Sequence, residues 1–165
     1  MVNVIWRNNL FWIKMKPVRG KFFGTAGIRG VFNREITFEL VFRLAYALTS
    51  FKRYGEVTIA RDGRLGGEAI KNELRSAFIA SSWNVYDLNA AVTPLLAFAT
   101  RELSDFGVMV TASHNPPQYV GMKVFCENGM ELPMNLEDKI EERMRKYCSP
   151  SINSVSYTHL TLPTN

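Results

Sequence analysis

Segments with the periodicity of helices alternate with short apolar runs typical of strands, and this alternation restricts the fold more than any other feature of the chain. We expect Thr37 to cap a largely apolar helix that continues to about Tyr54 and ends at Gly55. The remaining expected elements are a strand at 57–60, a helix at 67–82, a strand at 83–88, a helix at 94–103, a strand at 106–111 and a helix at 134–147. This order predicts an α/β fold, a three-layer α/β/α sandwich with a mainly parallel mixed sheet.

The apolar run at 106–110 has no polar interruption, which is typical of a central strand buried on both faces. Ligands of open α/β sheets bind beyond the carboxyl ends of the strands. Ser113 follows this strand, next to His114 and ahead of two consecutive prolines. The sequence therefore marks Ser113 as the first candidate for a functional residue. In the last helix, by contrast, the acidic residues precede most of the basic ones, which is the order that the helix dipole favours. We expect this charged run to form a solvated face and not a binding site.

The residues around Ser113 allow three interpretations. Ser-His-Asn-Pro-Pro is ordinary turn chemistry, in which short polar side chains bond to nearby backbone and prolines stop a helix. A serine hydrolase needs a base that reaches the hydroxyl and a carboxylate that orients the base, but no G-x-S-x-G elbow is present and an adjacent histidine usually points away. A phosphoryl carrier fits better, because an exposed serine among backbone donors and cations can hold a dianionic phosphate.

Charge and composition exclude other classes of protein. The chain has 165 residues, enough for one domain, and a net charge of +5. Five basic residues within the first twenty-one positions account for this whole excess, so the remainder is neutral and does not predict nucleic-acid binding. The two cysteines lack metal-ligand spacing and no transmembrane run is present, so we expect a cytoplasmic protein without a membrane partner.

Five motifs resemble the first domain of a known enzyme family. They are FGTAGIRG at 23–30, ARDGR at 60–64, TPLLAFATRE at 93–102, TASHNPPQYVGMKVF at 111–125 and NGMEL at 128–132. In order and spacing they are similar to domain I of the α-D-phosphohexomutases, in the phosphomannomutase/phosphoglucomutase branch. The resemblance covers about 21–147 and favours the phosphoryl-carrier interpretation.

The resemblance implies a role for each residue of the serine motif. Ser113 corresponds to the phosphoserine that gives its phosphoryl group to a hexose phosphate, forms a bound hexose 1,6-bisphosphate and takes the other phosphoryl group back. The net reaction moves phosphate between C1 and C6. His114 corresponds to a substrate contact, Lys123 to a general acid/base and Arg29 to a cation at the same centre. Without the resemblance, the sequence is equally consistent with Arg29 as an ordinary surface arginine and with Lys123 as a lysine on an edge strand.

Further residues are implied as parts of the substrate or phosphate loops. Glycines near a phosphate allow close approach of the backbone or positive φ, although they also occur in plain turns. These candidates are Gly24, Thr25, Gly27, Gly30, Arg61, Arg64 and Asn115, the last as a loop-shaping residue. Two positions depart from the family pattern, since Ala60 stands where glycine is usual and Val120 where asparagine is usual.

The resemblance also implies parts that this sequence does not encode. Mg²⁺ would be held by three aspartates of a second domain, with Ser113 contributing only through its phosphoryl oxygen. We expect a leader at 1–20, the mutase domain at 21–150 and a tail unlike the family at 151–165, and therefore a fragment that is inactive without domains II to IV. The alternative is a non-catalytic module of the same fold that binds sugar phosphates or another partner. The sequence does not choose between mannose, glucose and glucosamine phosphates.

Overall fold

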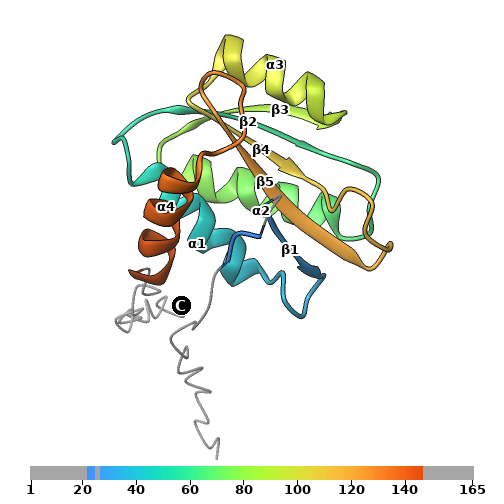
Figure 1. Cartoon of the computed structure of the whole chain (residues 1–165). Coiled ribbons are helices and arrows are strands. Elements are labelled where there is room, and N and C mark those ends of the chain that lie inside the picture. The colour runs from blue at the N-terminus through green and yellow to red at the C-terminus, as the bar shows by residue number, and fades with distance from the viewer. Residues whose placement is uncertain (1–21, 25–26, 147–165) are drawn as a thin grey trace, which may run out of the picture.

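The computed structural model describes residues 22–24 and 27–146 of the chain, so the expected leader and tail lie outside the described residues. Strands and helices alternate along this part of the chain (Figure 1). Their bounds are β1 (Ile28–Val31), α1 (Phe38–Thr49), β2 (Glu56–Arg61), α2 (Gly67–Ala80), β3 (Asn84–Ala90), α3 (Thr93–Leu103), β4 (Phe106–Val110), β5 (Tyr119–Cys126) and α4 (Met134–Lys146).

The strands form one mixed sheet in the order β1-β5-β4-β2-β3. β2 pairs in parallel with β3 and β4, whereas β5 is antiparallel to both β4 and β1. Four strands therefore run in one direction and β5 runs in the other. β4 is the middle strand and all five of its residues are buried, as its apolar run predicts.

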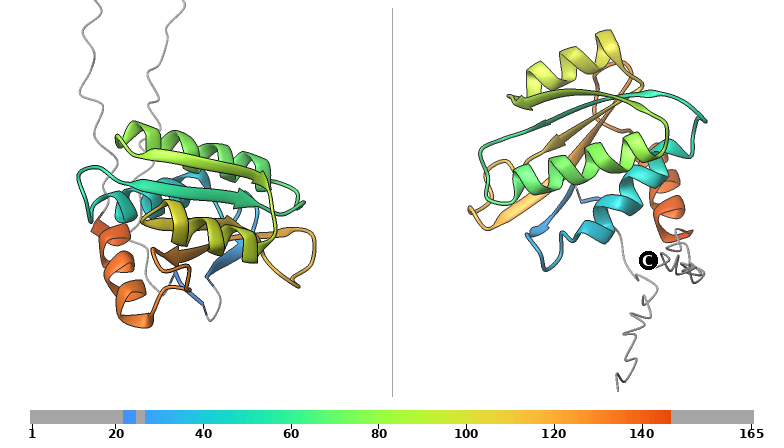
Figure 2. Two further views of the ribbon diagram at one scale, coloured as in Figure 1. Left: turned by 90° about the horizontal axis from the view of Figure 1, so that it is seen from above. Right: turned by 180° about the vertical axis from the view of Figure 1, so that it is seen from behind.

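Helices cover both faces of this sheet (Figures 1 and 2). α1 and α2 pack on one face over the larger core, and α4 packs against α1. α3 alone covers the other face in the described part of the chain, over a smaller core of Ala60, Leu96, Met109 and Phe125. The predicted three-layer α/β/α sandwich is confirmed.

α1 begins where the sequence predicts and ends earlier. The Thr37 hydroxyl accepts a hydrogen bond from the Leu40 N–H at 3.3 Å, as a capping residue does. The predicted end near Tyr54 is wrong, because the helix stops at Thr49 and the Ser50 hydroxyl donates to the Ala47 carbonyl at 2.7 Å. Phe51 then turns inward, with its ring centroid 6.1 Å from that of Phe106. The ring is partly buried against the larger core.

The interpretation of Lys123 as an edge-strand residue is also wrong. Lys123 lies on β5, which is hydrogen-bonded on both sides, to β4 and to β1. Neither β1 nor β5 was among the elements expected from periodicity, because glycines interrupt the apolar pattern of both strands. β5 pairs with β4 and β1 pairs with β5, and this pairing supplies the stability that their local sequences lack.

The prediction that α4 presents its charges to solvent is wrong for one residue. Glu141 is only 3% exposed, and one carboxylate oxygen accepts hydrogen bonds from the backbone N–H groups of Phe22 and Phe23, each at 2.8 Å. Its other oxygen accepts from Arg145 at 2.5 Å. α4 thereby anchors the segment that leads into the loop before β1.

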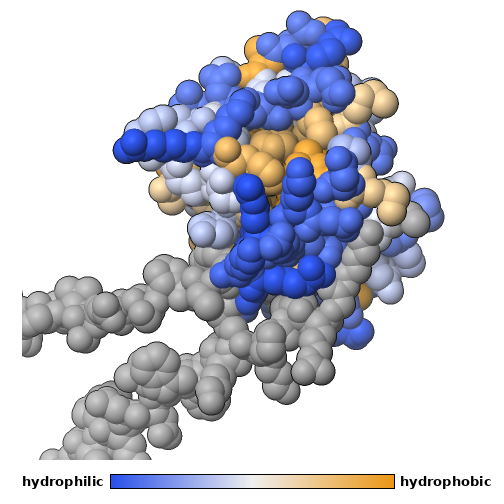
Figure 3. Space-filling view, turned by 60° about the vertical axis from the view of Figure 1, so that its left-hand side comes forward, coloured by the Kyte–Doolittle hydropathy of each residue, from blue (hydrophilic) through white to orange (hydrophobic). Residues whose placement is uncertain are grey.

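The surface of the domain is mixed in character. Figure 3 shows hydrophilic side chains over most of one face, around an apolar patch. Several large apolar side chains are exposed on the helices, among them Phe38, Phe42 and Tyr46 of α1 and Leu95 and Phe98 of α3. None of the helices in the described residues has the length and apolar character needed to span a bilayer.

Candidate functional site

Ser113 lies just beyond the carboxyl end of β4, in the loop that leads to β5. The backbone N–H of Thr111 donates to the Gly121 carbonyl at 2.9 Å, so the two strands stay paired up to the base of this loop. Ser113 itself is exposed and has a φ of 55°, in the left-handed region. The fold thus presents the hydroxyl group at the strand end where open α/β sheets bind ligands.

Arg64 reaches the serine loop from the loop that follows β2. Its Nη1 donates to the carbonyl oxygens of Asn115 at 2.9 Å and of Pro116 and Tyr119 at 3.1 Å. Its Nη2 donates to the carbonyl oxygen of Ser113. The Arg64 side chain is only 13% exposed. The structure therefore places Arg64 against the loop backbone, and Asn115 contributes a carbonyl group to that contact.

Asp62 connects Arg64 to the base of the same loop. Its carboxylate accepts from Arg64 Nε at 3.1 Å and from the Thr111 hydroxyl at 2.6 Å. The Thr111 hydroxyl oxygen in turn accepts from the Ser113 N–H at 3.0 Å. The Asp62 N–H also donates to the Val110 carbonyl at 3.0 Å, which extends the pairing of β2 with β4 into the two loops.

His114 lies closer to Ser113 than the sequence suggests. Its Nδ1 is 3.5 Å from Ser113 Oγ, at the limit of hydrogen-bond reach, instead of pointing away. Both residues are exposed. Among the described residues no carboxylate contacts the His114 ring, so the group that a hydrolase uses to orient its base is missing from this part of the chain.

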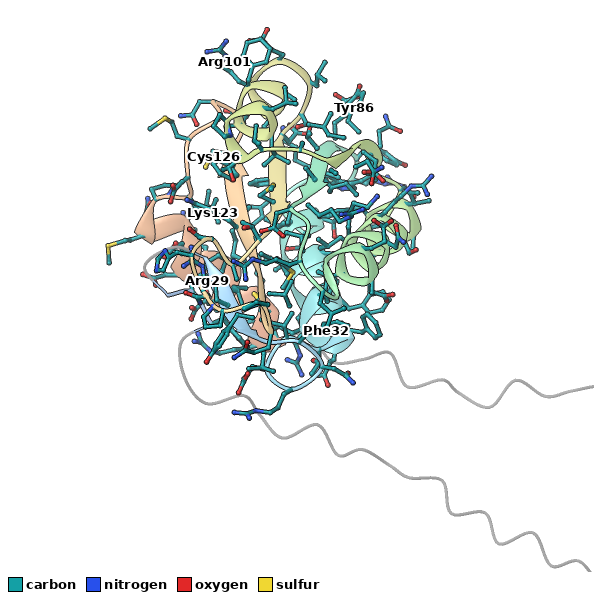
Figure 4. The ribbon with its side chains drawn as sticks, turned by 90° about the vertical axis from the view of Figure 1, so that its right-hand side faces the viewer. Arg29, Phe32, Tyr86, Arg101, Lys123 and Cys126 are labelled. Carbon is teal, nitrogen blue, oxygen red and sulfur yellow. The ribbon has the colours of Figure 1, made fainter. Side chains whose placement is uncertain are left out.

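Lys123 and Arg29 share one face of the sheet beside the serine loop. Arg29 pairs with Gly121 across β1 and β5, and Lys123 is two residues further along β5, so both side chains project from the same face. Gly121 also accepts the Thr111 N–H, so it lies between Arg29 and the base of the serine loop. Figure 4 shows Arg29 and Lys123 in the same region, and Arg101 at the far end of the molecule.

The two cations differ in their partners. Lys123 Nζ forms an ion pair with the carboxylate of Glu131, and its side chain is 19% exposed. The Nε of Arg29 is buried and has no hydrogen-bond partner among the described residues. A buried N–H without a partner is costly, so a ligand oxygen that reached Arg29 would be bound favourably.

A cavity of about 500 Å³ opens beside Lys123, lined also by Glu131 and by Gly24 and Gly27 of the preceding loop. The Gly24 N–H donates to the Gly27 carbonyl at 3.0 Å, which closes this loop. Gly27 has a φ of 92°, and a Cβ there would come within 2.6 Å of the Met122 carbonyl oxygen. Gly24 and Gly30 have ordinary φ values, and Thr25 lies outside the described residues. Of the candidate glycines at 24, 27 and 30, Gly27 is the one whose φ requires glycine.

Arg61 is directed away from the serine. Its guanidinium forms an ion pair with Glu68 of α2 and donates to the Asp62 carbonyl at 3.1 Å. The structure therefore brings Ser113, His114, Asn115 and Arg64 together in one loop contact and Arg29 with Lys123 on the adjoining sheet face, while Arg61 packs against α2.

Comparison with known proteins shows the family to which the chain belongs. The family model described as phosphoglucomutase/phosphomannomutase, alpha/beta/alpha domain I, matches residues 20–150. The chain belongs to this family. It is 41% identical over 127 residues to the phosphoglucosamine mutase of Alkaliphilus metalliredigens, covering 74% of this chain and 28% of that protein. It is 38% identical over 139 residues to the phosphoglucosamine mutase of Thermotoga neapolitana, covering 81% of this chain and 32% of that protein.

A solved structure of a phosphoglucomutase/phosphomannomutase family protein from Burkholderia thailandensis superposes with a TM-score of 0.65. It is 26% identical, and the match covers 76% of this chain and 30% of that one. The chain therefore spans about three tenths of the length of the relatives that it matches, and corresponds to domain I of this mutase family.

The two departures from the family pattern fall in the cores of the domain. Ala60 is fully buried beneath α3 with Leu96 and Met109. Val120 is fully buried in the larger core, on the opposite face of β5 from Lys123. Both side chains therefore contribute to packing, and Val120 does not line the face that carries the two cations.

Magnesium does not fit the described part of this mutase domain by itself. No group of three histidine, cysteine, aspartate or glutamate residues within 22–24 and 27–146 is arranged to hold a metal ion. Ser113 offers a single oxygen, whereas Mg²⁺ takes octahedral coordination by several oxygen ligands. The ion expected from the family therefore needs carboxylates from outside these residues.

Sequence reasoning missed three residues that contact the site, although each lies in a motif of the family. Asp62 lies between the two arginines of ARDGR, Thr111 opens the serine motif and Glu131 belongs to NGMEL. An acidic residue between two basic ones indicates local charge pairing, which is a usable signal for Asp62. Glu131 gives no such signal. It lies near Lys123 only because the chain folds back and its backbone forms a β-bridge with Phe125.

Proposed function

We propose that this chain is the catalytic-serine domain of a phosphohexomutase, with Ser113 as the phosphoryl carrier. The observation that carries the proposal is the exposed hydroxyl of Ser113 at the carboxyl end of the central strand, in a loop whose backbone is held from both sides. Family membership supports the reaction class. A module that only binds sugar phosphates needs no such fixed hydroxyl.

The transfer that we propose moves one phosphoryl group between two hydroxyl oxygens. A hydroxyl of the hexose phosphate gives up its proton and attacks the phosphorus of phosphorylated Ser113. The bond from that phosphorus to Ser113 Oγ breaks, Oγ takes up a proton and a bisphosphate forms. In the second step the other phosphoryl group of this hexose 1,6-bisphosphate returns to Ser113. Such transfers depend on positioning and on neutralising the phosphoryl oxygens more than on covalent chemistry by the protein.

Lys123 and Arg29 are suited to different parts of this transfer. Within the described part of the chain the buried Nε of Arg29 has no partner, and it can donate to a phosphoryl oxygen that reaches it. Lys123 can accept the proton of the attacking hydroxyl only as a neutral amine, so it has to leave its ion pair with Glu131 and give a proton to solvent first. His114, exposed beside Ser113, is placed to contact the bound sugar phosphate.

The substrate class that we propose is a hexosamine or hexose phosphate. Relatives named phosphoglucosamine mutase favour the amino sugar. Because the chain spans about three tenths of these relatives, we propose that the remaining domains supply the sugar contacts and the magnesium ligands. Without them the isolated chain should not isomerise hexose phosphates, since loss of even one preorganised charge contact costs about 100-fold or more in rate.

The test is whether Ser113 carries or accepts phosphate. The purified chain is examined by intact mass and by phosphopeptide mapping, before and after incubation with glucose 1,6-bisphosphate, and Ser113→Ala serves as the control. One phosphate that maps to Ser113 and is absent from the variant supports the proposal. Absence of phosphate from Ser113 both here and in the complete mutase that contains this domain favours a binding module, and labelling by acyl-type serine probes favours a hydrolase.

A further inference from the structure

The loop that carries Ser113 is held by a side chain from a different loop. Arg64 follows β2, and its guanidinium donates to four backbone carbonyl groups between 113 and 119. We propose that Arg64 and Asp62 are a positioning pair that fixes the backbone of Ser113 and so aims its hydroxyl group. This inference rests on the proposed role of Ser113 and assigns Arg64 to the loop instead of to the substrate phosphate.

Both polar backbone groups of Ser113 are held by one closed network. Its carbonyl oxygen accepts from Arg64, and its N–H donates to the Thr111 hydroxyl at 3.0 Å. That hydroxyl donates to Asp62 at 2.6 Å, and the same Asp62 oxygen accepts from Arg64 Nε at 3.1 Å. The carbonyl of Ser113 cannot turn without breaking its bond to Arg64, and the N–H cannot turn without breaking its bond to Thr111, which is itself bonded to Asp62.

The conformation of Ser113 shows why such a restraint is needed. Its φ of 55° is disfavoured for a residue with a Cβ atom. Strained backbone of this kind persists where the surrounding contacts impose it, and it is concentrated at functional sites. Without the contacts from Arg64 and Thr111 the loop would relax to other conformations and the hydroxyl would lose its direction.

Arg64 is poorly suited to bind the substrate phosphate. Four of its five N–H groups are engaged with the protein: two on Nη1 with three carbonyl oxygens, one on Nη2 with the Ser113 carbonyl, and the Nε proton with Asp62. The Asp62 carboxylate also neutralises the charge locally. A lysine could replace that charge, but it lacks the planar fork that reaches Asp62 and the loop carbonyls together.

The first experiment measures the loop itself in the 165-residue chain, and does not depend on catalysis. Amide NMR spectra and hydrogen exchange are compared for the wild type, Arg64→Lys and the control Arg101→Lys, whose exposed side chain pairs with Glu102 on α3. We expect Arg64→Lys to shift the amides of 113–119 and to accelerate exchange at Ser113 by about tenfold or more, since a local restraint is lost. Unchanged loop amides would overturn the inference.

A second pair of variants covers the case in which Arg64→Lys fails to fold. Thr111→Val keeps the shape of the side chain and removes the hydroxyl that links Asp62 to the Ser113 N–H. Thr111→Ser retains that hydroxyl. Faster exchange at Ser113 in the valine variant, recovered in the serine variant, supports the inference, and equal exchange in both contradicts it.

The functional consequence is measured in the complete mutase that contains this domain. Misplacement of a reacting group by about 1 Å costs on the order of 100-fold in rate. We therefore expect Arg64→Lys to lower kcat by about that factor, with KM for the hexose phosphate changed less than about twofold, and Arg101→Lys to leave both unchanged. A raised KM with an unchanged kcat would show that Arg64 binds phosphate after all. If wild-type Ser113 never carries phosphate, the proposed function fails, while the exchange data still decide whether the loop is held as inferred.

Discussion

Replacement of Glu141 by alanine should destabilise the domain more than any other single change to the charged residues of α4. Glu141 is 3% exposed, and one of its carboxylate oxygens accepts the N–H groups of Phe22 and Phe23 at 2.8 Å each. These contacts join the start of the described chain to its last helix. Glu141→Ala removes this acceptor from both N–H groups and leaves the Phe23 N–H buried without a partner.

The expected magnitude follows from these two hydrogen bonds. A hydrogen bond to a charged acceptor contributes about 1.5–3 kcal/mol, and an unsatisfied buried donor costs about 1–3 kcal/mol. The Phe22 N–H is only partly buried and can return to water, and Arg145 is 41% exposed. Loss of the bonds from these two groups to Glu141 therefore adds little to the cost. We expect a loss of about 2–4 kcal/mol in the free energy of unfolding. For a domain of this size that lowers Tm by about 8–16 °C.

Thermal unfolding followed by circular dichroism measures this difference. The matched control is Glu142→Ala, because Glu142 is adjacent in sequence, 63% exposed and paired with Lys146 one helical turn away. An exposed pair of this kind contributes about 0.5 kcal/mol or less. If Glu141→Ala lowers Tm no more than Glu142→Ala does, the carboxylate does not anchor the entering segment and the reasoning is refuted.

Three further outcomes are expected. Ser113→Ala should abolish nearly all turnover of the complete mutase and leave Tm almost unchanged, because Ser113 is exposed. Full activity of the variant would show that Ser113 is not the phosphoryl carrier. Deletion of residues 1–14 and 151–165 should reduce self-association measured by light scattering without lowering Tm, and a less stable product would show that these ends pack natively. Burial raises the pKa of Asp105, but Lys52 and a backbone N–H together hold it below its ordinary value. Its contribution to stability is therefore present above the unfolded pKa and is lost as pH falls below about 4, and acid titration of Asp105→Asn should show a smaller loss.

The fold was largely predictable from periodicity. The elements at 67–80, 93–103 and 106–110 lie within a few residues of their expected positions, because their apolar residues repeat at the spacing of helices or strands. The early end of α1 was not predictable, since it depends on Phe51 packing against Phe106, a residue far along the chain. The same is true of β1, whose pairing with β5 joins segments about ninety residues apart.

The position of the site was predictable and its internal contacts were not. Ser113 was placed at a strand end by the apolar run before it, and the family motifs marked Arg29 and Lys123. The partners of these residues could not be found in this way. Arg64 contacts a loop 49 residues away, and Glu131 reaches Lys123 because the chain turns back after β5.

Sequence alone thus determined the class of fold, the strand after which Ser113 lies and the resemblance to the mutase family, because these depend on local spacing and on contiguous motifs. Only the tertiary structure decided that Arg64 holds the serine loop, that Lys123 is paired with Glu131 and that Glu141 is buried. The physical reason is that each of these charges has its partner on another element, and the choice of partner is fixed only when the sheet and its helices have packed.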